Sequence, residues 1–154
     1  MRAVLQRVSM AEVSWEESGM RRGERIGRGL VLLLGVGARD GDRQARQLAA
    51  RVGVMRVFNG PRGVPDLALG DIQAEALVVP QFTLFADLSR GRRPSFLGAA
   101  SSSMARELFD SFCDYLGAHA PIRRGRFGAD MRLQLSNEGP FTLCLDTDVW
   151  EEGG

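Results

Sequence analysis

The sequence predicts a single α/β domain over residues 1–154, in which a mixed β-sheet packs against two main helices. Residues 29–36 hold six apolar residues interrupted only by glycine, which is typical of a central strand covered on both faces. Two later segments carry apolar residues at helical spacing. The first of them lies between two strand patterns, which implies at least one parallel strand pair. The length of 154 residues fits one domain with one core.

The N-terminal segments read as strands. Residues 3–8 are mostly apolar and residues 11–15 alternate, so both are predicted to be strands that pair as an antiparallel unit. Residues 16–28 hold three glycines and four arginines, which favours a turn followed by a short exposed strand. The central strand 29–36 follows.

The first helix comes after residues 37–41. Its apolar stripe falls at positions i, i+3, i+4 and i+7, namely Ala45, Leu48, Ala49 and Val52. Residues 54–58 then indicate another strand, and residues 59–63 a turn. Residues 67–69 fit a short edge strand, and the apolar residues before Pro80 fit a buried strand over 74–80.

The second helix is predicted over residues 102–116, with serines at its start and Gly117 at its end. Strand patterns return over 131–136 and 141–145, separated by Asn137-Glu138-Gly139-Pro140. This interruption fits either a sharp bend in the chain or an ordinary hairpin turn. The last residues, 150–154, are expected to fray.

Missing residue types narrow the chemistry. All 20 basic residues are arginine, so there is no lysine for a Schiff base or an amine-type general base. His119 is the only histidine and follows a helix exit, which disfavours a Ser-His-Asp triad. Cys113 and Cys144 have no second pair to complete a zinc site and are expected to be buried, reduced thiols. We therefore expect no cofactor and no metal.

Hydropathy and charge give limited information about binding partners. No run approaches the roughly 18 apolar residues of a membrane span, and the start lacks a signal-peptide layout, so we expect a cytoplasmic protein without a membrane partner. The net charge of +1 gives little support for nucleic-acid binding. Arginine clusters at 21–28, 90–93 and 123–126 offer local phosphate contacts, with solvated faces near acidic residues as the alternative.

The stretch Pro80-Gln81-Phe82-Thr83 is the main candidate site, because it follows the end of a buried strand. The alternative is structural: Pro80 ends the strand, Gln81 lies exposed at an edge and Thr83 packs.

Six motifs together resemble one family, the D-aminoacyl-tRNA deacylases, in family order over nearly the whole chain. They are Gln6-Arg7-Val8, residues 29–36, Gln81-Phe82-Thr83-Leu84 with Ala86-Asp87, residues 90–96, residues 125–131 and residues 137–142. The resemblance implies a compact domain with a barrel-like sheet core, working as a homodimer. It also implies hydrolysis of the ester between a D-amino acid and the 3′-terminal adenosine of tRNA, with glycyl-tRNA as a further substrate. Aminoacylated tRNA, not DNA, is the expected partner.

By the same resemblance, Gln81, Phe82 and Thr83 are the catalytic positions. Thr83 has no lysine or nearby histidine to activate it, and the aminoacyl ester is already reactive, with a vicinal ribose hydroxyl that can take part. The hypothesis is that backbone N–H groups around Phe82 and Thr83 hold the ester carbonyl, with the Thr83 hydroxyl secondary.

Substrate-binding roles are implied for seven further residues: Arg7, Pro80, Phe127, Met131, Asn137, Gly139 and Pro140. In the resembling family the Gly139-Pro140 bond is cis and enters the other subunit's site, where backbone carbonyls crowd an L side chain but let glycine pass. Arg7 would support this segment, with a solvated strand position as the alternative. Phe127 and Met131 would line the adenosine pocket, with plain core packing as the alternative.

The sequence departs from the family pattern at two places. Pro80 stands where serine is usual, which removes a hydroxyl and a backbone donor. Pro65 and Asp66 replace the more usual methionine and asparagine. A related branch found in animals, which clears mischarged L-alanine, carries Pro-Gln at the first of these points. A Pro-Gln-type deacylase for small L-aminoacyl-tRNA and a non-catalytic module that binds the tRNA end therefore stay as alternatives.

Overall fold

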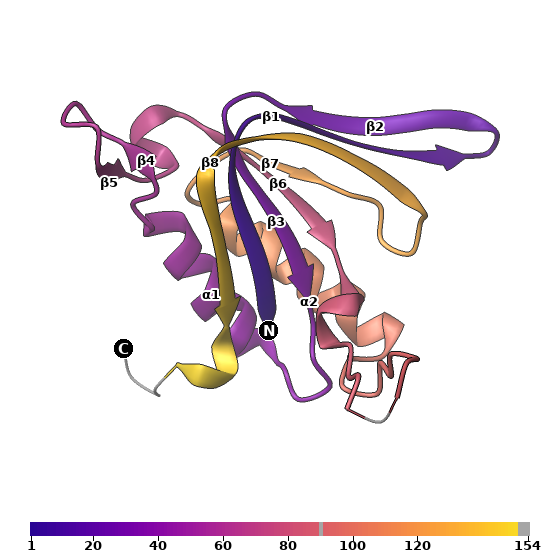
Figure 1. The fold of residues 1–154 in the computed structure, drawn as a ribbon. Coiled ribbons are helices and arrows are strands. Elements are labelled where there is room, and N and C mark those ends of the chain that lie inside the picture. Colours follow the sequence, from indigo (N-terminus) through magenta and orange to yellow (C-terminus); the bar gives the residue numbers. More distant parts are fainter. Residues whose placement is uncertain (90, 151–154) are drawn as a thin grey trace.

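The computed structural model describes residues 1–89 and 91–150. They form one α/β domain in which a six-stranded mixed sheet carries two α-helices on one face (Figure 1). The strand order is β2-β1-β3-β6-β7, and β8 also pairs with β1. The large elements are β1 (Arg2–Glu17), β2 (Met20–Ile26), β3 (Gly29–Gly35), α1 (Asp42–Val54), β6 (Glu75–Pro80), α2 (Ser102–Leu116), β7 (Ile122–Arg124) and β8 (Met131–Asp146).

The smaller elements are β4 (Phe58–Asn59), β5 (Pro65–Leu67) and three 3-10 helices: η1 (Gly70–Ile72), η2 (Phe82–Phe85) and η3 (Thr147–Val149). β4 and β5 pair only with each other. η2 follows β6 directly and begins the segment that leaves the sheet.

The prediction of at least one parallel strand pair is confirmed, although residues 54–58, the strand pattern from which it was inferred, are not part of that pair. β3 pairs with β6 in parallel, with Gly29 opposite Glu75 and Leu34 opposite Pro80. β6 pairs in parallel with β7 on its other side. Parallel neighbouring strands need a crossover connection, and α1 after β3 and α2 after β6 provide the two crossovers. Both helices pack on the same face of the sheet.

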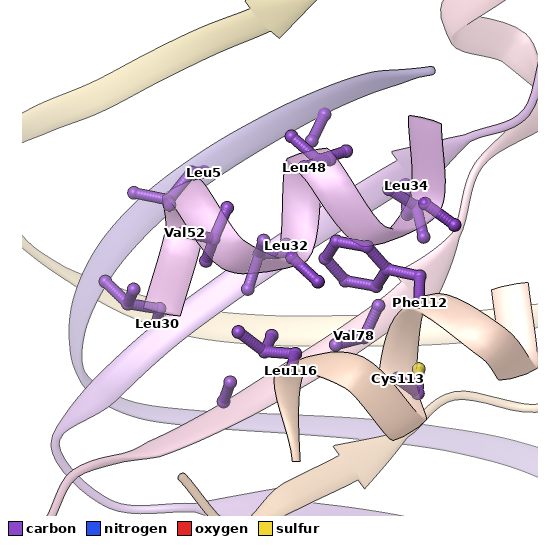
Figure 2. Packing of buried hydrophobic residues seen from close by; sticks show 14 of the residues in the cluster. Leu5, Leu30, Leu32, Leu34, Leu48, Val52, Val78, Phe112, Cys113 and Leu116 are labelled. Carbon is purple, nitrogen blue, oxygen red and sulfur yellow. The ribbon is translucent and has the colours of Figure 1, made fainter. Parts of the chain in front are cut away.

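The main core lies between the sheet and the two helices. Leu30, Leu32 and Leu34 of β3 are buried against Leu48 of α1 and Phe112 of α2, among others. Figure 2 shows Phe112 pointing from α2 toward Leu32 and Leu34. The stripe that predicted each helix is therefore its buried face.

A second, smaller core lies on the opposite side of the sheet. It contains Val8, Ala11 and Val13 of β1, Ile26 of β2, Val31 of β3, and Leu77 and Val79 of β6. β2 also contacts β6 and β7, although it pairs with neither, so the sheet curls into a nearly closed, barrel-like shape. β3 is thus covered on both faces, as its apolar run predicts.

Two long strands replace the shorter ones that the sequence indicates. The prediction that residues 3–8 pair with residues 11–15 is wrong: both belong to β1, which pairs with β3 over Arg2–Val8 and with β2 over Ala11–Glu17. A two-residue hairpin needs positive φ, which favours glycine or asparagine, and neither Ser9 nor Met10 adopts it. A bulge bends the strand here without reversing its direction. β8 likewise runs through the expected interruption, so the hairpin alternative is wrong, and Figure 1 shows the bend in the strand.

Other boundaries also differ. The predicted strand over residues 54–58 is wrong, because α1 continues to Val54 and only Phe58–Asn59 is extended and paired. The edge strand expected at residues 67–69 lies at Pro65–Leu67, since Leu69 is buried before η1. β7 was not predicted, because Ile122-Arg123-Arg124 is too short and too charged to show an apolar pattern.

The two cysteines differ in burial. Cys113 is buried, and burial raises the pKa of its thiol to about 12. Cys144 is exposed, which corrects the expectation that both are buried.

At the C-terminus Trp150 packs on the core, with the Arg51 guanidinium 4.3 Å from its ring centre, so fraying does not begin at this residue; the rest of the expected fraying, at 151–154, lies outside the described residues. Within the described part, neither helix has the length and hydropathy to cross a bilayer.

We predict that Phe112→Ala lowers the free energy of unfolding by about 3–5 kcal/mol, because it leaves a cavity between the sheet and both helices. Urea denaturation measures the change. The control is Val149→Ala, whose side chain is 76% exposed and whose loss changes stability by less than about 0.5 kcal/mol. A small effect of Phe112→Ala, equal to that of the control, contradicts this view of the core.

Candidate functional site

The candidate site starts where β6 leaves the sheet. Pro80 is the last β6 residue and pairs with Leu34, and the Gln81 N–H donates to the Leu34 carbonyl at 2.8 Å. The chain then turns into η2 at Phe82. Gln81 and Thr83 therefore stand just past the carboxyl end of a strand in a parallel pair, which is a common position for ligand sites in α/β sheets.

Pro80 fits this position because the neighbouring strand has already ended. β7 pairs with Ala76, Leu77 and Val78 only, and the Gly125 N–H caps the Val78 carbonyl at 2.8 Å. A proline has no N–H, so it is tolerated only where no ladder bond is required. The break in β7 removes that requirement at residue 80.

The first turn of η2 leaves two backbone donors without carbonyl partners. The Leu84 N–H donates to the Gln81 carbonyl at 3.3 Å, which closes the turn. Among the described residues, the N–H groups of Phe82 and Thr83 donate to no backbone carbonyl, as expected at a helix start. The Gln81 side-chain amide donates to the Thr83 hydroxyl, so these two side chains are held together.

A cavity of about 640 Å³ opens beside this strand end. Its walls come from β3, β6, η2, α2, β8 and the loops that precede α2 and β8, and they are mostly apolar with a few polar groups. A cavity of this size and character suits a small organic ligand with flat, apolar faces. Five of the residues predicted for the site line it: Pro80, Gln81, Phe82, Phe127 and Met131.

Phe127 and Met131 shape the wall opposite η2. A Cβ on Gly125 would lie 3.0 Å from the Met131 sulfur and 3.3 Å from Pro80 Cδ, so the missing side chain lets these two residues approach each other. Phe127 meets Phe109 edge to face, with 6.2 Å between ring centres. Phe127 packs against the main core and Met131 against the smaller core. Each of the two residues therefore both lines the cavity and packs on a core.

Phe96 and Phe109 line the cavity but were not predicted as site residues. Phe109 belongs to the apolar stripe of α2, which sequence alone reads as core. Phe96 is the last residue of the motif at 90–96, and membership of that motif was the one sequence feature that could have identified it as a site residue. Phe96 meets the exposed Phe82 ring edge to face at 5.0 Å, so the two rings stand together at the cavity.

The loop that carries Phe96 is anchored at both ends. Asp87 and Ser95 exchange backbone hydrogen bonds of 2.8 and 2.9 Å, and the Ala100 N–H donates to Val36 at the end of β3. The Asp87 carboxylate accepts from the Ser89 N–H at 2.8 Å, which lowers the pKa of Asp87. Arg90, in the motif and in one arginine cluster, lies outside the described residues.

The remaining predicted residues gather elsewhere, around a break in the β1–β8 ladder. Thr142 faces Gln6 and Asn137 faces Val8, so residues 138–141 bulge out opposite Arg7 alone. Arg7 is 7% exposed. It donates to the carbonyls of Glu138 at 2.8 Å and Val57 at 2.6 Å, and its guanidinium lies 4.7 Å from the Phe141 ring centre.

Asn137 completes this cluster, because its amide donates to the Arg7 carbonyl at 2.8 Å and to the Phe141 carbonyl at 3.1 Å. Gly139 and Pro140 are exposed at the tip of the bulge, joined by a cis peptide bond. Neither lines the cavity. Arg7 faces Leu30 and Pro80 faces Leu34, so the two groups are separated by four residues of β3, on the order of 13 Å.

His119 contributes to neither group. Its ring packs on Gly53, where a Cβ would lie 2.3 Å from the ring. The described residues contain no cluster of three or more histidine, cysteine, aspartate or glutamate side chains arranged to hold a metal ion. The strand end offers backbone N–H groups, the Thr83 hydroxyl, the Gln81 amide and an apolar wall. Ser102 and Asp130 add a hydroxyl and a carboxyl group to the cavity lining.

Comparison with known proteins finds a matching family model and solved structures of the same fold. The family model described as D-Tyr-tRNA(Tyr) deacylase matches residues 4–146. A solved structure titled "c-Myc DNA Unwinding Element Binding Protein" is 33% identical, with a TM-score of 0.86 over 96% of this chain and 99% of that chain. Another, titled as a probable eukaryotic D-amino acid tRNA deacylase, shares the fold at 20% identity, with a TM-score of 0.78 over 94% of this chain and 97% of that chain.

The family match covers nearly the whole chain, and the strand-end cavity and the Gly139–Pro140 bulge both lie within it. The chain belongs to the D-Tyr-tRNA(Tyr) deacylase family and is an ester hydrolase of the D-aminoacyl-tRNA deacylase type.

Proposed function

We propose that this protein removes D-amino acids and glycine from tRNA by binding the 3′-terminal adenosine in the cavity beside Gln81 and Phe82. One observation supports this above the others: Phe82, Phe96 and Phe127 line the cavity, and the N–H groups of Phe82 and of the next residue, Thr83, have no carbonyl partner among the described residues. Aromatic rings stack on a nucleobase, and N–H donors stabilise an ester oxyanion. The cavity therefore offers both parts that an aminoacyl-adenosine ester needs.

The catalytic step follows from what the chain supplies. The ester carbonyl accepts from the N–H groups of Phe82 and Thr83, which stabilise the negative charge that forms on its oxygen when a water molecule attacks the carbonyl carbon. The vicinal ribose hydroxyl assists this attack. The ester bond then breaks as the ribose oxygen takes up a proton, which releases the free amino acid and the tRNA. The Thr83 hydroxyl is held by the Gln81 amide. Gln81 and Thr83 thus position the ester and add a polar contact, and neither forms a bond to the substrate.

Rejection of L-amino acids requires a second copy of the chain. Gly139 and Pro140 do not line the cavity of their own chain, and Arg7, which holds their bulge, lies on the order of 13 Å along β3 from the position of Pro80. They are nevertheless exposed at the tip of a bulge that Arg7 and Asn137 hold from behind. In a homodimer this tip enters the partner's cavity and crowds the direction of an L side chain, while glycine passes.

Pro80 makes a Pro-Gln-type deacylase, which clears small L-aminoacyl-tRNA, the second candidate. A proline in place of serine removes a hydroxyl and a donor from the cavity wall. The cytoplasmic location expected from the sequence stays a prediction.

The central test is the release of amino acid from D-tyrosyl-, L-tyrosyl-, glycyl- and L-alanyl-tRNA by the purified protein with a chelator present. The proposal expects rapid loss of the D-tyrosyl and glycyl esters and survival of the L-tyrosyl ester. Rapid loss of L-alanyl-tRNA favours the second candidate. If every ester survives, while the same tRNAs still bind, the protein is a non-catalytic module.

Thr83→Ala is predicted to lower kcat for D-tyrosyl-tRNA by less than about tenfold, because the backbone N–H groups remain. Single-turnover kinetics measure the chemical step. Thr83→Ser, which keeps the hydroxyl, is the matched control and retains wild-type rates. A loss near 10⁴-fold in Thr83→Ala contradicts the backbone mechanism and makes Thr83 a nucleophile.

Gly139→Ala is predicted to raise the ratio of L-tyrosyl to D-tyrosyl release at least about tenfold, since one interaction of 1.4 kcal/mol is worth that factor. The added Cβ would lie 2.2 Å from the Asn137 side-chain oxygen and 2.7 Å from the Phe141 nitrogen, so the bulge must move. Gly27→Ala has no atom within 4 Å of its Cβ and is the matched control. An unchanged ratio in a folded Gly139→Ala protein removes this segment from chiral discrimination.

A further inference from the structure

In two of the suspected phosphate-binding clusters, at 21–28 and 123–126, arginines are already paired with carboxylates. Arg123 lies 3.5 Å from Glu75 and 3.7 Å from Glu24, and Arg126 lies 2.9 Å from Glu17. Arg124 pairs with Asp110 and Asp114, and Arg21 and Arg28 pair with Glu12 and Glu138. Such pairs must be broken before the arginine binds a phosphate, so these clusters are weaker candidates than the sequence indicates.

Arg106 differs from these residues. It is exposed on α2, and no carboxylate of the described residues lies within 4.0 Å of its guanidinium. Its guanidinium stacks 4.9 Å from the centre of the Phe127 ring, and Phe127 lines the cavity. Of the arginines without a carboxylate partner in the described chain, Arg106 is the one that stacks on a ring of the cavity wall.

The helix fixes Arg106 beside the cavity. Ser102, Ala105 and Phe109 of α2 all line it, and Arg106 is one residue from Ala105 and three from Phe109, so it stands next to the lining face of the helix. The contact with the Phe127 ring keeps the guanidinium near the cavity wall, while the residue as a whole is exposed to solvent. Arginine in this state is suited to bidentate contact with a phosphate.

We propose that Arg106 binds the phosphate that joins the terminal adenosine to the preceding nucleotide of the RNA. The inference rests on the proposed function, because it takes the adenosine to lie in the cavity against Phe127. The RNA chain must then leave the cavity at its rim, where Arg106 supplies an unneutralised positive charge. Arg106 is a positioning residue, which selects an RNA end over a free nucleoside ester.

The test compares two substrates that differ in phosphate: D-tyrosyl-tRNA and 2′(3′)-O-D-tyrosyl-adenosine, which has none. Arg106→Gln is expected to raise KM for the tRNA about tenfold, with kcat unchanged, because a charge-assisted contact is lost. Its effect on the adenosine ester stays within twofold. The slope of log(kcat/KM) against log[salt] for the tRNA becomes shallower by about 0.7, the value for one contact to single-stranded RNA.

Two variants control for packing. Arg106→Lys keeps the charge but loses the planar fork, so its KM for the tRNA is expected to lie between those of the wild type and Arg106→Gln, with the wild-type salt slope. Arg51→Gln removes an arginine whose guanidinium lies 4.3 Å from the centre of the Trp150 ring, away from the cavity. It is expected to leave kcat and KM unchanged for both substrates. If Arg106→Gln slows both substrates equally, Arg106 only supports Phe127, and if it slows neither, Arg106 has no role; both results overturn the proposal.

Binding of uncharged tRNA separates this inference from the proposed function. If the wild-type protein hydrolyses no ester, the proposed function fails, and weaker, less salt-dependent tRNA binding by Arg106→Gln still supports the phosphate contact. Equal tRNA binding by the wild-type protein and Arg106→Gln overturns it whatever the activity.

Discussion

The parallel pairing of β3 with β6 is the constraint on which the site depends. It fixes Pro80 opposite Leu34, and one further hydrogen bond, from Gln81 to Leu34, sets the point where the chain leaves the sheet. Because both strands are buried on both faces, a shift by one residue would turn the side chains of each strand to the other core. The position of the N–H groups of η2 is therefore fixed by two hydrophobic cores and not by the loop itself.

Arg7 plays the corresponding role for the bulge at residues 138–141. It is a buried cation with no carboxylate partner in the described chain, and its charge is balanced by the carbonyl dipoles of Val57 and Glu138 and by the Phe141 ring. These partners come from β8 and from the segment before β4. Because an unpaired buried charge is costly, the guanidinium ties the bulge to the domain more firmly than the broken strand ladder alone does.

The sequence predicted the parts of the fold that have a strong period. The stripe of α1, the stripe of α2 and the apolar run of β3 were read correctly because burial imposes these patterns directly. β7 was missed because three residues with two arginines pair through their backbone, which leaves no trace in side-chain type. The continuity of β1 was missed because a bulge and a turn both interrupt alternation.

The site was predicted unevenly for similar reasons. Motifs led to Gln81, Phe127 and Met131, which line one cavity, and to Arg7, Asn137 and Gly139, which lie together elsewhere. That these are two places in one chain follows only from strand register, which sequence patterns do not give. Arg106 has no motif at all, since its position depends on a helix meeting a loop through the Phe127 ring.

Because β7 ends before it reaches residue 80, strand pairing does not restrict which amino acid stands at that position. The peptide nitrogen there has no strand opposite it, so the sheet places no demand on which residue supplies it. Proline and serine are both compatible with the ladder, yet they present different surfaces to the cavity. A protein with this sheet can change the polarity of the cavity wall at a single codon without losing a ladder hydrogen bond, so substrate range can diverge among relatives while the scaffold stays the same.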